Sequence, residues 1–244
     1  MSRAEEITVV ARRVAGEPAF ELRHGDALVL FGVGPPGAAA PAERRAAAIL
    51  AKLSPALRRV RWARQLHGAT VVDVAASGSG PAACVGDADG LVSCDAGTGL
   101  VVLTADCVPL ALVGPGTVAM VHAGWRGAAA GIVTAAVRRI AASGMPPGQL
   151  RAFLGPAVCG RHYQVGPEVI EALKRAGVPA AGWLDGDRVD LRRFLAGQLA
   201  DLGIAGVQAV GPCTFDTPEL ASYRRDGAAA GRQWSLVWRT ESSG

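Results

Sequence analysis

Three near-continuous apolar runs dominate the middle of the chain, at residues 100–103, 108–113 and 118–121. Runs of this kind are typical of strands that are covered on both faces. Reactive side chains follow two of them: Asp106 and Cys107 come after the first run, and His122 and Arg126 after the third. Burying polar or charged groups at the ends of strands costs free energy, and such groups are commonly retained because they bind a ligand or take part in catalysis. We therefore expect a functional site at these strand ends.

The remaining pattern predicts further strands at residues 7–14, 27–31, 58–65, 70–74, 150–154, 207–210 and 235–239. Helical spacing of apolar residues predicts helices at 41–53, 128–142, 167–176 and 190–202. Residues 32–39 and 75–83 are expected to be loops, and 86–90 a polar turn. Helices interleave with strands, and no repeat or linker is visible. The pattern therefore predicts a single mixed α/β domain over residues 1–244.

Composition restricts the class of protein. Half of the 244 residues are hydrophobic and 19% are charged, which favours a globular core. The net charge of +4 is spread along the chain without a basic block, which argues against nucleic-acid binding. We find no signal-peptide pattern and no apolar run long enough to span a bilayer, so no membrane association is expected. Five cysteines without a dense framework indicate a cytoplasmic protein with reduced thiols.

His67, Cys107 and His122 are the candidate metal ligands. Two imidazoles and a thiolate suit zinc, and three protein ligands leave a fourth position for water or substrate. The three residues are far apart in the sequence and form no CxxC or HExxH motif, so a buried cysteine with two hydrogen-bonded histidines is the structural alternative. A second alternative is a nucleophilic pair of Cys107 and His122 that acts on an amide or acyl group without metal.

Residues 124–127, Gly-Trp-Arg-Gly, form a predicted junction between a strand and a helix. A helix start with Arg126 is suited to bind phosphate or carboxylate, although an ordinary turn with a solvated arginine fits equally well. Asp106 is a candidate partner of the metal ligands or a general base, or else it caps a turn.

Two further polar clusters contain Tyr163 and the pair Arg224 and Arg225. The paired arginines either hold an anionic group or form a solvated face. The remaining thiols have no partners at ligand spacing, and we expect them to be packed: Cys84, Cys94, Cys159 and Cys213.

Five short motifs, taken together, resemble the YfiH-like family, whose members are often labelled laccase-domain or polyphenol-oxidase proteins. They are QLHG at 65–68, TADC at 104–107, HAGWRG at 122–127, LGP at 154–156 and SYRRDG at 222–227. The resemblance covers roughly residues 60–238 in the family's order.

The resemblance implies a central β-sandwich flanked by helices, similar to bacterial toxin deamidase domains, in a cytoplasmic monomer. It implies one zinc ion held by His67, Cys107 and His122. It also implies phosphorolysis of adenosine, inosine, guanosine and methylthioadenosine, together with deamination of adenosine. Purine nucleosides and phosphate would then be the partners.

Under this interpretation Asp106, Cys107 and Arg126 are the candidate catalytic residues, and Arg126 contacts phosphate or ribose. The candidate substrate contacts are Gln65, Arg126, Tyr163 and Arg224. The chain departs from the family near its N-terminus, where the segment from Phe31, FGVGPPGAAAPAERR, is shortened and lacks a Ser-Leu-Asn-like motif. His162 and Gln164 also replace the frequent cysteine and glutamate, so the substrate range is open.

The histidine count argues against true laccase chemistry. A multicopper oxidase needs roughly ten histidines, because imidazole is a main copper ligand, and this chain has four. Adventitious copper at a Cys/His site would be unsurprising, since copper binds such donors more tightly than zinc. Two other functions stay open. One is an amide hydrolase that edits a peptidoglycan precursor through the same site, and the other is a zinc-stabilised binding module that unfolds without metal.

Overall fold

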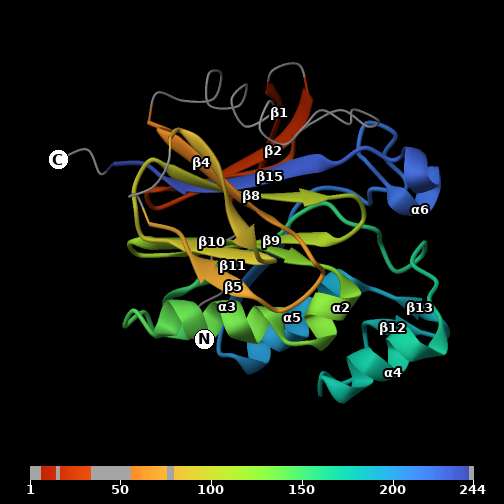
Figure 1. The fold of residues 1–244 in the computed structure, drawn as a ribbon. Coiled ribbons are helices and arrows are strands. Elements are labelled where there is room, and N and C mark those ends of the chain that lie inside the picture. Colours follow the sequence, from red (N-terminus) through yellow and green to blue (C-terminus); the bar gives the residue numbers. More distant parts are fainter. Residues whose placement is uncertain (1–6, 15–16, 34–55, 76–79, 242–244) are drawn as a thin grey trace.

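Two large β-sheets stack face to face, and helices cover the outer face of one of them (Figure 1). A computed structural model of the chain describes residues 7–14, 17–33, 56–75 and 80–241. The arrangement confirms the predicted mixed α/β fold. No helix among the described residues is long and apolar enough to cross a membrane.

The first sheet has seven strands in the order β1-β2-β3-β15-β8-β4-β6. Their bounds are β1 Val10–Val14, β2 Glu17–His24, β3 Ala27–Val33, β15 Gln233–Arg239, β8 Thr98–Thr104, β4 Arg59–Arg64 and β6 Ala82–Asp87. The C-terminal strand β15 pairs antiparallel with both β3 and β8. It therefore joins the N-terminal hairpins to the strands that lead into the site.

The second sheet has six strands in the order β14-β11-β9-β10-β7-β5. Their bounds are β14 Gly206–Ala209, β11 Arg151–Leu154, β9 Val108–Gly114, β10 Thr117–Ala123, β7 Gly90–Ser93 and β5 Val71–Asp73. Strands β9 and β10 form a hairpin around Pro115 and Gly116, and Gly116 has the positive φ of 76° that such a turn requires. Every residue of both strands is buried, as their apolar runs predict.

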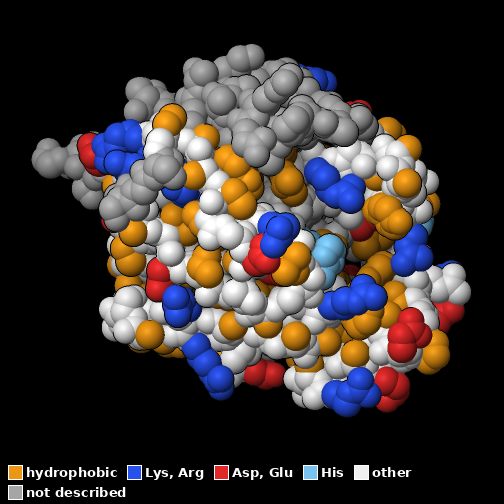
Figure 2. All heavy atoms as spheres, in the orientation of Figure 1, with side chains coloured by type: hydrophobic (Ala, Val, Ile, Leu, Met, Phe, Trp, Pro, Cys, Tyr) orange, Lys and Arg blue, Asp and Glu red, His pale blue; other side chains and the backbone are white. Residues whose placement is uncertain are grey.

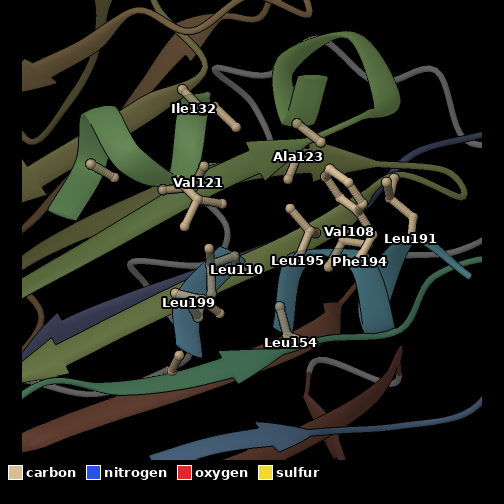
Figure 3. Close-up of a cluster of buried hydrophobic side chains, with 14 of the residues drawn as sticks. Val108, Leu110, Val121, Ala123, Ile132, Leu154, Leu191, Phe194, Leu195 and Leu199 are labelled. Carbon is tan, nitrogen blue, oxygen red and sulfur yellow. The ribbon is translucent and has the colours of Figure 1, made fainter. Parts of the chain in front are cut away.

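Both faces of the second sheet are covered. The face toward the first sheet packs Ala111, Met120 and Phe153 against side chains such as Val29 and Leu100. The other face packs against the helices α2 Trp125–Ala129, α3 Ile132–Ala141, α4 Pro167–Arg175 and α5 Leu191–Asp201. Figure 3 shows this second layer, in which Leu110 and Val121 of the sheet meet Ile132 of α3 and Leu195 and Leu199 of α5.

The predicted helix at 128–142 is two helices. Gly131 adopts a left-handed conformation with φ 83°, which ends α2 and starts α3 at Ile132. Apolar residues at helical spacing form one buried face of α3: Ile132, Val133, Ala136, Val137 and Ile140.

The helices predicted at 167–176 and 190–202 are observed as α4 and α5. Asp190 is the N-cap of α5 and accepts a hydrogen bond from the N–H of Arg193. The helix predicted at 41–53 and most of the loop 32–39 lie outside the described residues.

Several elements are missing from the predicted set. Strand β2 contains alternating charged residues, and β6 lies where the loop 75–83 and the turn 86–90 are expected. Both strands form because neighbours in the sheet pair with their backbones. The remaining elements are short: β12 Leu184–Asp185, β13 Arg188–Val189, α6 Tyr223–Asp226, and the 3-10 helices η1 Pro147–Gln149 and η2 Gly227–Ala229.

Candidate active site

The register of the β9–β10 hairpin brings Cys107 and His122 together. Ala123 pairs with Val108 and His122 pairs with Pro109, so Cys107 comes just before the paired end of β9. The residues 105–107 also carry the chain from β8 in the first sheet to β9 in the second. The site therefore lies at one end of the sandwich, where the chain crosses between its sheets.

His67 reaches the same point from the loop between β4 and β5. One ligand atom from each of His67, Cys107 and His122 lies within 4.8 Å of the other two. The two imidazole rings have centroids 4.7 Å apart and are nearly perpendicular, at 88°. The structure thus brings together the three residues that the sequence analysis selected as ligands.

A buried carboxylate, Asp89, holds the His67 loop in place. It accepts hydrogen bonds from the backbone N–H groups of Leu66, His67 and Gly68 at 3.1, 2.9 and 2.8 Å. His67 has φ 61°, a conformation that is rare outside glycine and is retained only where the surroundings enforce it. The three hydrogen bonds provide that enforcement.

The same carboxylate orients His122. Oδ1 of Asp89 lies 2.8 Å from Nδ1 of His122, and both side chains are almost fully buried. This contact leaves Nε2 of His122 as the nitrogen that faces the cluster, an arrangement common among metal-ligating histidines. Burial raises the pKa of Asp89, but the hydrogen bonds from His122 and the 67–68 backbone outweigh it, so the pKa is below its usual value.

The thiol and imidazole shift each other's ionisation. Burial raises the pKa of Cys107, but hydrogen bonds with His122 and His67 lower it to about 7. Burial lowers the pKa of His122, but its hydrogen bonds with Asp89 and Cys107 raise it to about 9. Cys107 therefore has thiolate character near neutral pH, which is the form that binds a metal or acts as a nucleophile.

Two glycines allow the loops around the cluster to approach closely. A Cβ atom at Gly124 would lie 3.0 Å from Sγ of Cys107 and 3.2 Å from Cδ2 of His67. A Cβ atom at Gly127 would lie 2.8 Å from the carbonyl oxygen of Gly68. The Gly-Trp-Arg-Gly junction is therefore the backbone wall against which the thiol and the His67 loop pack.

A cavity of about 730 Å³ opens beside the cluster. Eight predicted site residues line it, whereas the predicted Arg225 does not: Gln65, His67, Asp106, Cys107, His122, Arg126, Tyr163 and Arg224. In Figure 2 a histidine side chain lies at a hollow near the centre of the face, with Lys or Arg side chains on several sides. The cavity is large enough for a nucleoside-sized ligand.

Arg126 and Arg224 supply positive charge to this cavity. The guanidinium of Arg126 lies 4.3 Å from the ring centroid of Trp125, and that of Arg224 lies 5.2 Å from the ring centroid of Tyr163. Within the described part of the chain, neither arginine forms an ion pair with a carboxylate. Burial raises the pKa of Tyr163 to about 12, so its hydroxyl stays protonated and can donate a hydrogen bond.

Asp106 has both carboxylate oxygens engaged. Oδ1 accepts a hydrogen bond from Oγ1 of Thr214 at 2.6 Å, and Oδ2 accepts one from the N–H of Arg224 at 2.5 Å. Its φ of 84° is a second positive value outside glycine. These contacts favour a positioning role, in which Asp106 fixes the segment that carries Arg224 beside the cluster.

Two other predicted residues also make structural contacts. The side-chain amide of Gln65 donates to the carbonyl of Leu103 and accepts from its N–H, which fixes β4 to β8 beyond their paired residues. Arg225 donates to the carbonyls of Thr214, Phe215, Thr217 and Leu220 and pairs with Asp226. Arg225 is thus neither a free anion site nor a solvated side chain, because its donors fold the 214–226 segment.

The sequence analysis does not select Asp89 as a site residue, because Asp89 lies in the predicted polar turn 86–90. The only local signal is its position directly before the buried strand β7, where an isolated carboxylate needs partners.

The expectation that the four other cysteines are packed is wrong in part. Cys84 and Cys94 are exposed, and Cys159 and Cys213 lie within 4.8 Å of each other and of a carboxylate oxygen of Asp216.

A family model described as "Multi-copper polyphenol oxidoreductase laccase" matches residues 37–240. The chain belongs to this family. Two solved structures share the fold of this chain. YlmD from Geobacillus stearothermophilus is 26% identical with a TM-score of 0.77, and the match covers 96% of this chain and all of YlmD. Bacillus licheniformis YfiH, 22% identical, has a TM-score of 0.76 over 98% of each chain.

Proteins with similar sequences are named for a different activity. A protein of Streptomyces coelicolor named purine nucleoside phosphorylase is 40% identical over 232 residues, which cover 92% of this chain and 90% of the relative. A Pseudomonas aeruginosa protein with the same name is 38% identical over 190 residues, 74% of each chain. The family description and the names of these relatives therefore point to two different chemistries.

Proposed function

We propose that this protein is a metal-dependent purine nucleoside phosphorylase that works in the cavity beside His67, Cys107 and His122. The observation that carries the proposal is the three-donor cluster next to a cavity with two arginines unpaired among the described residues. The names of the Streptomyces and Pseudomonas relatives support the substrate class. Adenosine, inosine, guanosine and methylthioadenosine are the proposed nucleosides.

The cluster fits a zinc ion. His67, Cys107 and His122 are the donors that zinc prefers, three in number, and Asp89 supplies the carboxylate that usually orients a ligating histidine. His67, Cys107 and His122 also line the cavity, so a metal ion held by them would be accessible to a ligand there. A bound zinc ion would supply Lewis acidity at that position.

The arginines are suited to hold phosphate. Arg126 at the start of α2 and Arg224 at the start of α6 both line the cavity, and a guanidinium group can bind phosphate through two hydrogen bonds. In phosphorolysis a phosphate oxygen forms a bond to the anomeric carbon while the bond from that carbon to the purine nitrogen breaks. The bonding electrons leave with the base, which takes up a proton. Holding phosphate and nucleoside in line is the main contribution of such residues.

Tyr163 and the aromatic surfaces can bind the nucleoside. The protonated hydroxyl of Tyr163 is a hydrogen-bond donor, and the neighbouring rings offer apolar surface to a purine or ribose. Adenosine deamination at the same cluster is part of the proposal. Because both reactions use one site, loss of Cys107 should remove both.

Multicopper oxidase chemistry fits the described side chains poorly. In the described parts of the chain, two of the four histidines share a cluster, His67 and His122. His162 instead pairs with Asp216 at 2.7 Å, and the ring of His24 packs against Phe153. A copper ion at the His-Cys-His cluster remains compatible with its donors.

One observation favours a second function, amide hydrolysis of a peptidoglycan precursor. Cys107, His122 and Asp89 form a connected thiol–imidazole–carboxylate series, as in cysteine hydrolases. His67 beside the thiol has no place in such a series, and it is the residue that favours a metal site. Hydrolysis of an aminoacyl-sugar nucleotide that continues after chelation would support the second function.

The test is release of hypoxanthine from inosine by metal-loaded protein, with and without phosphate. We expect release that requires phosphate and that falls at least 100-fold in Cys107→Ala. Cys94→Ala is the matched control, because Cys94 is exposed and is not among the cavity residues. Release that is equal without phosphate, or that survives in Cys107→Ala, would contradict the proposal.

A further inference from the structure

Cys159 and Cys213 form a pair of neighbouring thiols outside the cavity, where two parallel strands end. Strands β11 and β14 pair through Leu154 and Ala209, and the pairing continues as a bridge between Ala157 and Cys213. Cys159 follows two residues later, and its backbone N–H donates to Sγ of Cys213 at 3.2 Å. The two sulfur atoms lie within 4.8 Å of each other. The sheet therefore holds two thiols from distant parts of the sequence in contact.

The surroundings of the two thiols shift their pKa values in opposite directions. Asp216 is already engaged, since its carboxylate oxygens lie 2.8 Å from Arg161 and 2.7 Å from His162. Burial raises the pKa of Cys159, but hydrogen bonds from Cys213 and Arg161 lower it below its usual value. Burial raises the pKa of Cys213, and its contact with Cys159 raises it further. One thiol is thus the better thiolate, and its neighbour retains its proton.

The two thiols also differ in their exposure to solvent. Cys159 is half-buried and lines a shallow surface cavity with Arg161, whereas Cys213 is buried. A small oxidant can therefore reach Cys159 first. The buried Cys213 then reacts with the oxidised sulfur of Cys159 and not with the oxidant itself. This combination of an accessible thiolate beside a cation and a protected second thiol is the arrangement of redox-sensitive cysteine pairs.

We propose that Cys159 and Cys213 form a reversible disulfide when the protein meets hydrogen peroxide. The Cys159 thiolate attacks one peroxide oxygen, the O–O bond breaks, and hydroxide leaves, so that Cys159 becomes a sulfenic acid. The Cys213 sulfur then attacks the Cys159 sulfur, the S–O bond breaks, and water leaves with the proton of Cys213. The two sulfurs have lost two electrons in total, which peroxide has taken up. A dithiol reductant reverses the reaction.

A metal ion is the other ligand that such a group could take, and the contacts disfavour it. A cation bound by Cys159, Cys213 and Asp216 would have to displace Arg161 and His162 from that carboxylate or lie against both. Formation of a disulfide leaves both ion pairs intact.

The position of the bond connects it with the cavity. Val158, next to Cys159, donates its N–H to the carbonyl of Asp106 at 3.1 Å, and Thr214, next to Cys213, donates its hydroxyl to the Asp106 carboxylate. Closing the disulfide brings the sulfurs to about 2.05 Å. It therefore ties together the two segments that hold Asp106 beside Cys107.

The experiment treats the metal-loaded protein with hydrogen peroxide, blocks free thiols and digests with trypsin without reductant. We expect a linked pair of peptides, residues 152–161 with 194–224, lighter by two hydrogen atoms than their sum and separated by dithiothreitol. Cys84 and Cys94, exposed thiols in a different tryptic peptide, are internal controls for simple accessibility. The linked pair should form before either control thiol is oxidised.

Variants test the order of the steps. Cys213→Ser should leave Cys159 as a sulfenic acid that dimedone labels, and Cys159→Ser should leave Cys213 unlabelled. Arg161→Gln should slow formation of the disulfide several-fold, because it removes the cation beside the thiolate. The proposal is overturned if no linked peptide forms, if Cys84 and Cys94 react first, or if bound zinc protects both thiols from oxidation.

Discussion

Asp89 is the residue on which the geometry of the cluster depends most. One buried carboxylate accepts three backbone hydrogen bonds from the His67 loop and orients the ring of His122. Two of the three candidate ligands are therefore positioned by a side chain that is not itself in the donor set. This explains how residues from separate loops reach one point without a compact sequence motif.

Replacing Asp89 should weaken metal binding more than it weakens the fold. In Asp89→Asn the side chain keeps its size but loses its charge, and one of its two accepting oxygens becomes an NH2 group that can only donate. Loss of such a partner usually lowers metal affinity by about 10–100-fold. Competition with a chromogenic chelator measures this. Asp87→Asn is the matched control, because Asp87 is exposed and its ion pair within the described part of the chain is with Arg64 on the surface. An affinity equal to that of the native protein would show that Asp89 has no such role.

Gly124 tests the packing of the thiol. In Gly124→Ala the new methyl group would lie 3.0 Å from Sγ of Cys107, so that either the thiol or the loop must move. We expect metal affinity to fall by at least tenfold while the circular dichroism spectrum is retained. Gly148→Ala serves as the control, since the nearest described atom to a Cβ there would be the Gly203 carbonyl oxygen, at 4.0 Å. Unchanged metal binding in Gly124→Ala would contradict the role of this glycine in positioning the Cys107 thiol.

Among the elements, those with a buried face were predictable and those stabilised by neighbours were not. The apolar runs of β8, β9 and β10 and the apolar face of α3 are visible in the sequence, because each buries a continuous set of side chains. Strand β6 is largely exposed, and its strand conformation depends on pairing with β4. No local pattern encodes such a partner.

The division of the predicted 128–142 helix depends on one backbone conformation. Gly131 has φ 83°, and a Cβ atom there would meet only Thr134, at 4.0 Å, so Gly131→Ala introduces backbone strain without a clash. We expect it to lower the free energy of unfolding by about 1–2 kcal/mol. Gly131→Asn should cost less, because asparagine tolerates the left-handed region. Urea denaturation measures both, and equal stability of all three proteins would contradict the strain.

At the scale of the whole molecule, the sequence alone could not predict which strands are neighbours. The resemblance implied a sandwich, but only the structure shows β15 between β3 and β8 and the 105–107 loop crossing between sheets. That crossing, with the β9–β10 register, brings Cys107 and His122 together, and Asp89 adds His67. The three residues could be chosen from their chemistry and the motifs, whereas their convergence required the tertiary structure.

The fold should survive removal of the metal. The packed layers lie along the length of both sheets, and the His-Cys-His cluster lies at one end. Chelation should therefore leave the circular dichroism spectrum unchanged. The melting temperature should fall by only about 5–10 °C, if bound metal contributes about 2.7 kcal/mol at a hundred times its Kd. Complete unfolding on chelation would instead support a zinc-stabilised binding module.

The most direct test of the central claim is to return zinc stepwise to chelated protein and to measure phosphate-dependent release of hypoxanthine from inosine. We predict that the rate rises in proportion to bound zinc and reaches its maximum at one ion per chain. His122→Ala should bind no zinc at these concentrations and should release no base. Full phosphorolysis by the metal-free protein, or by His122→Ala, would contradict the assignment of this cluster as the catalytic centre.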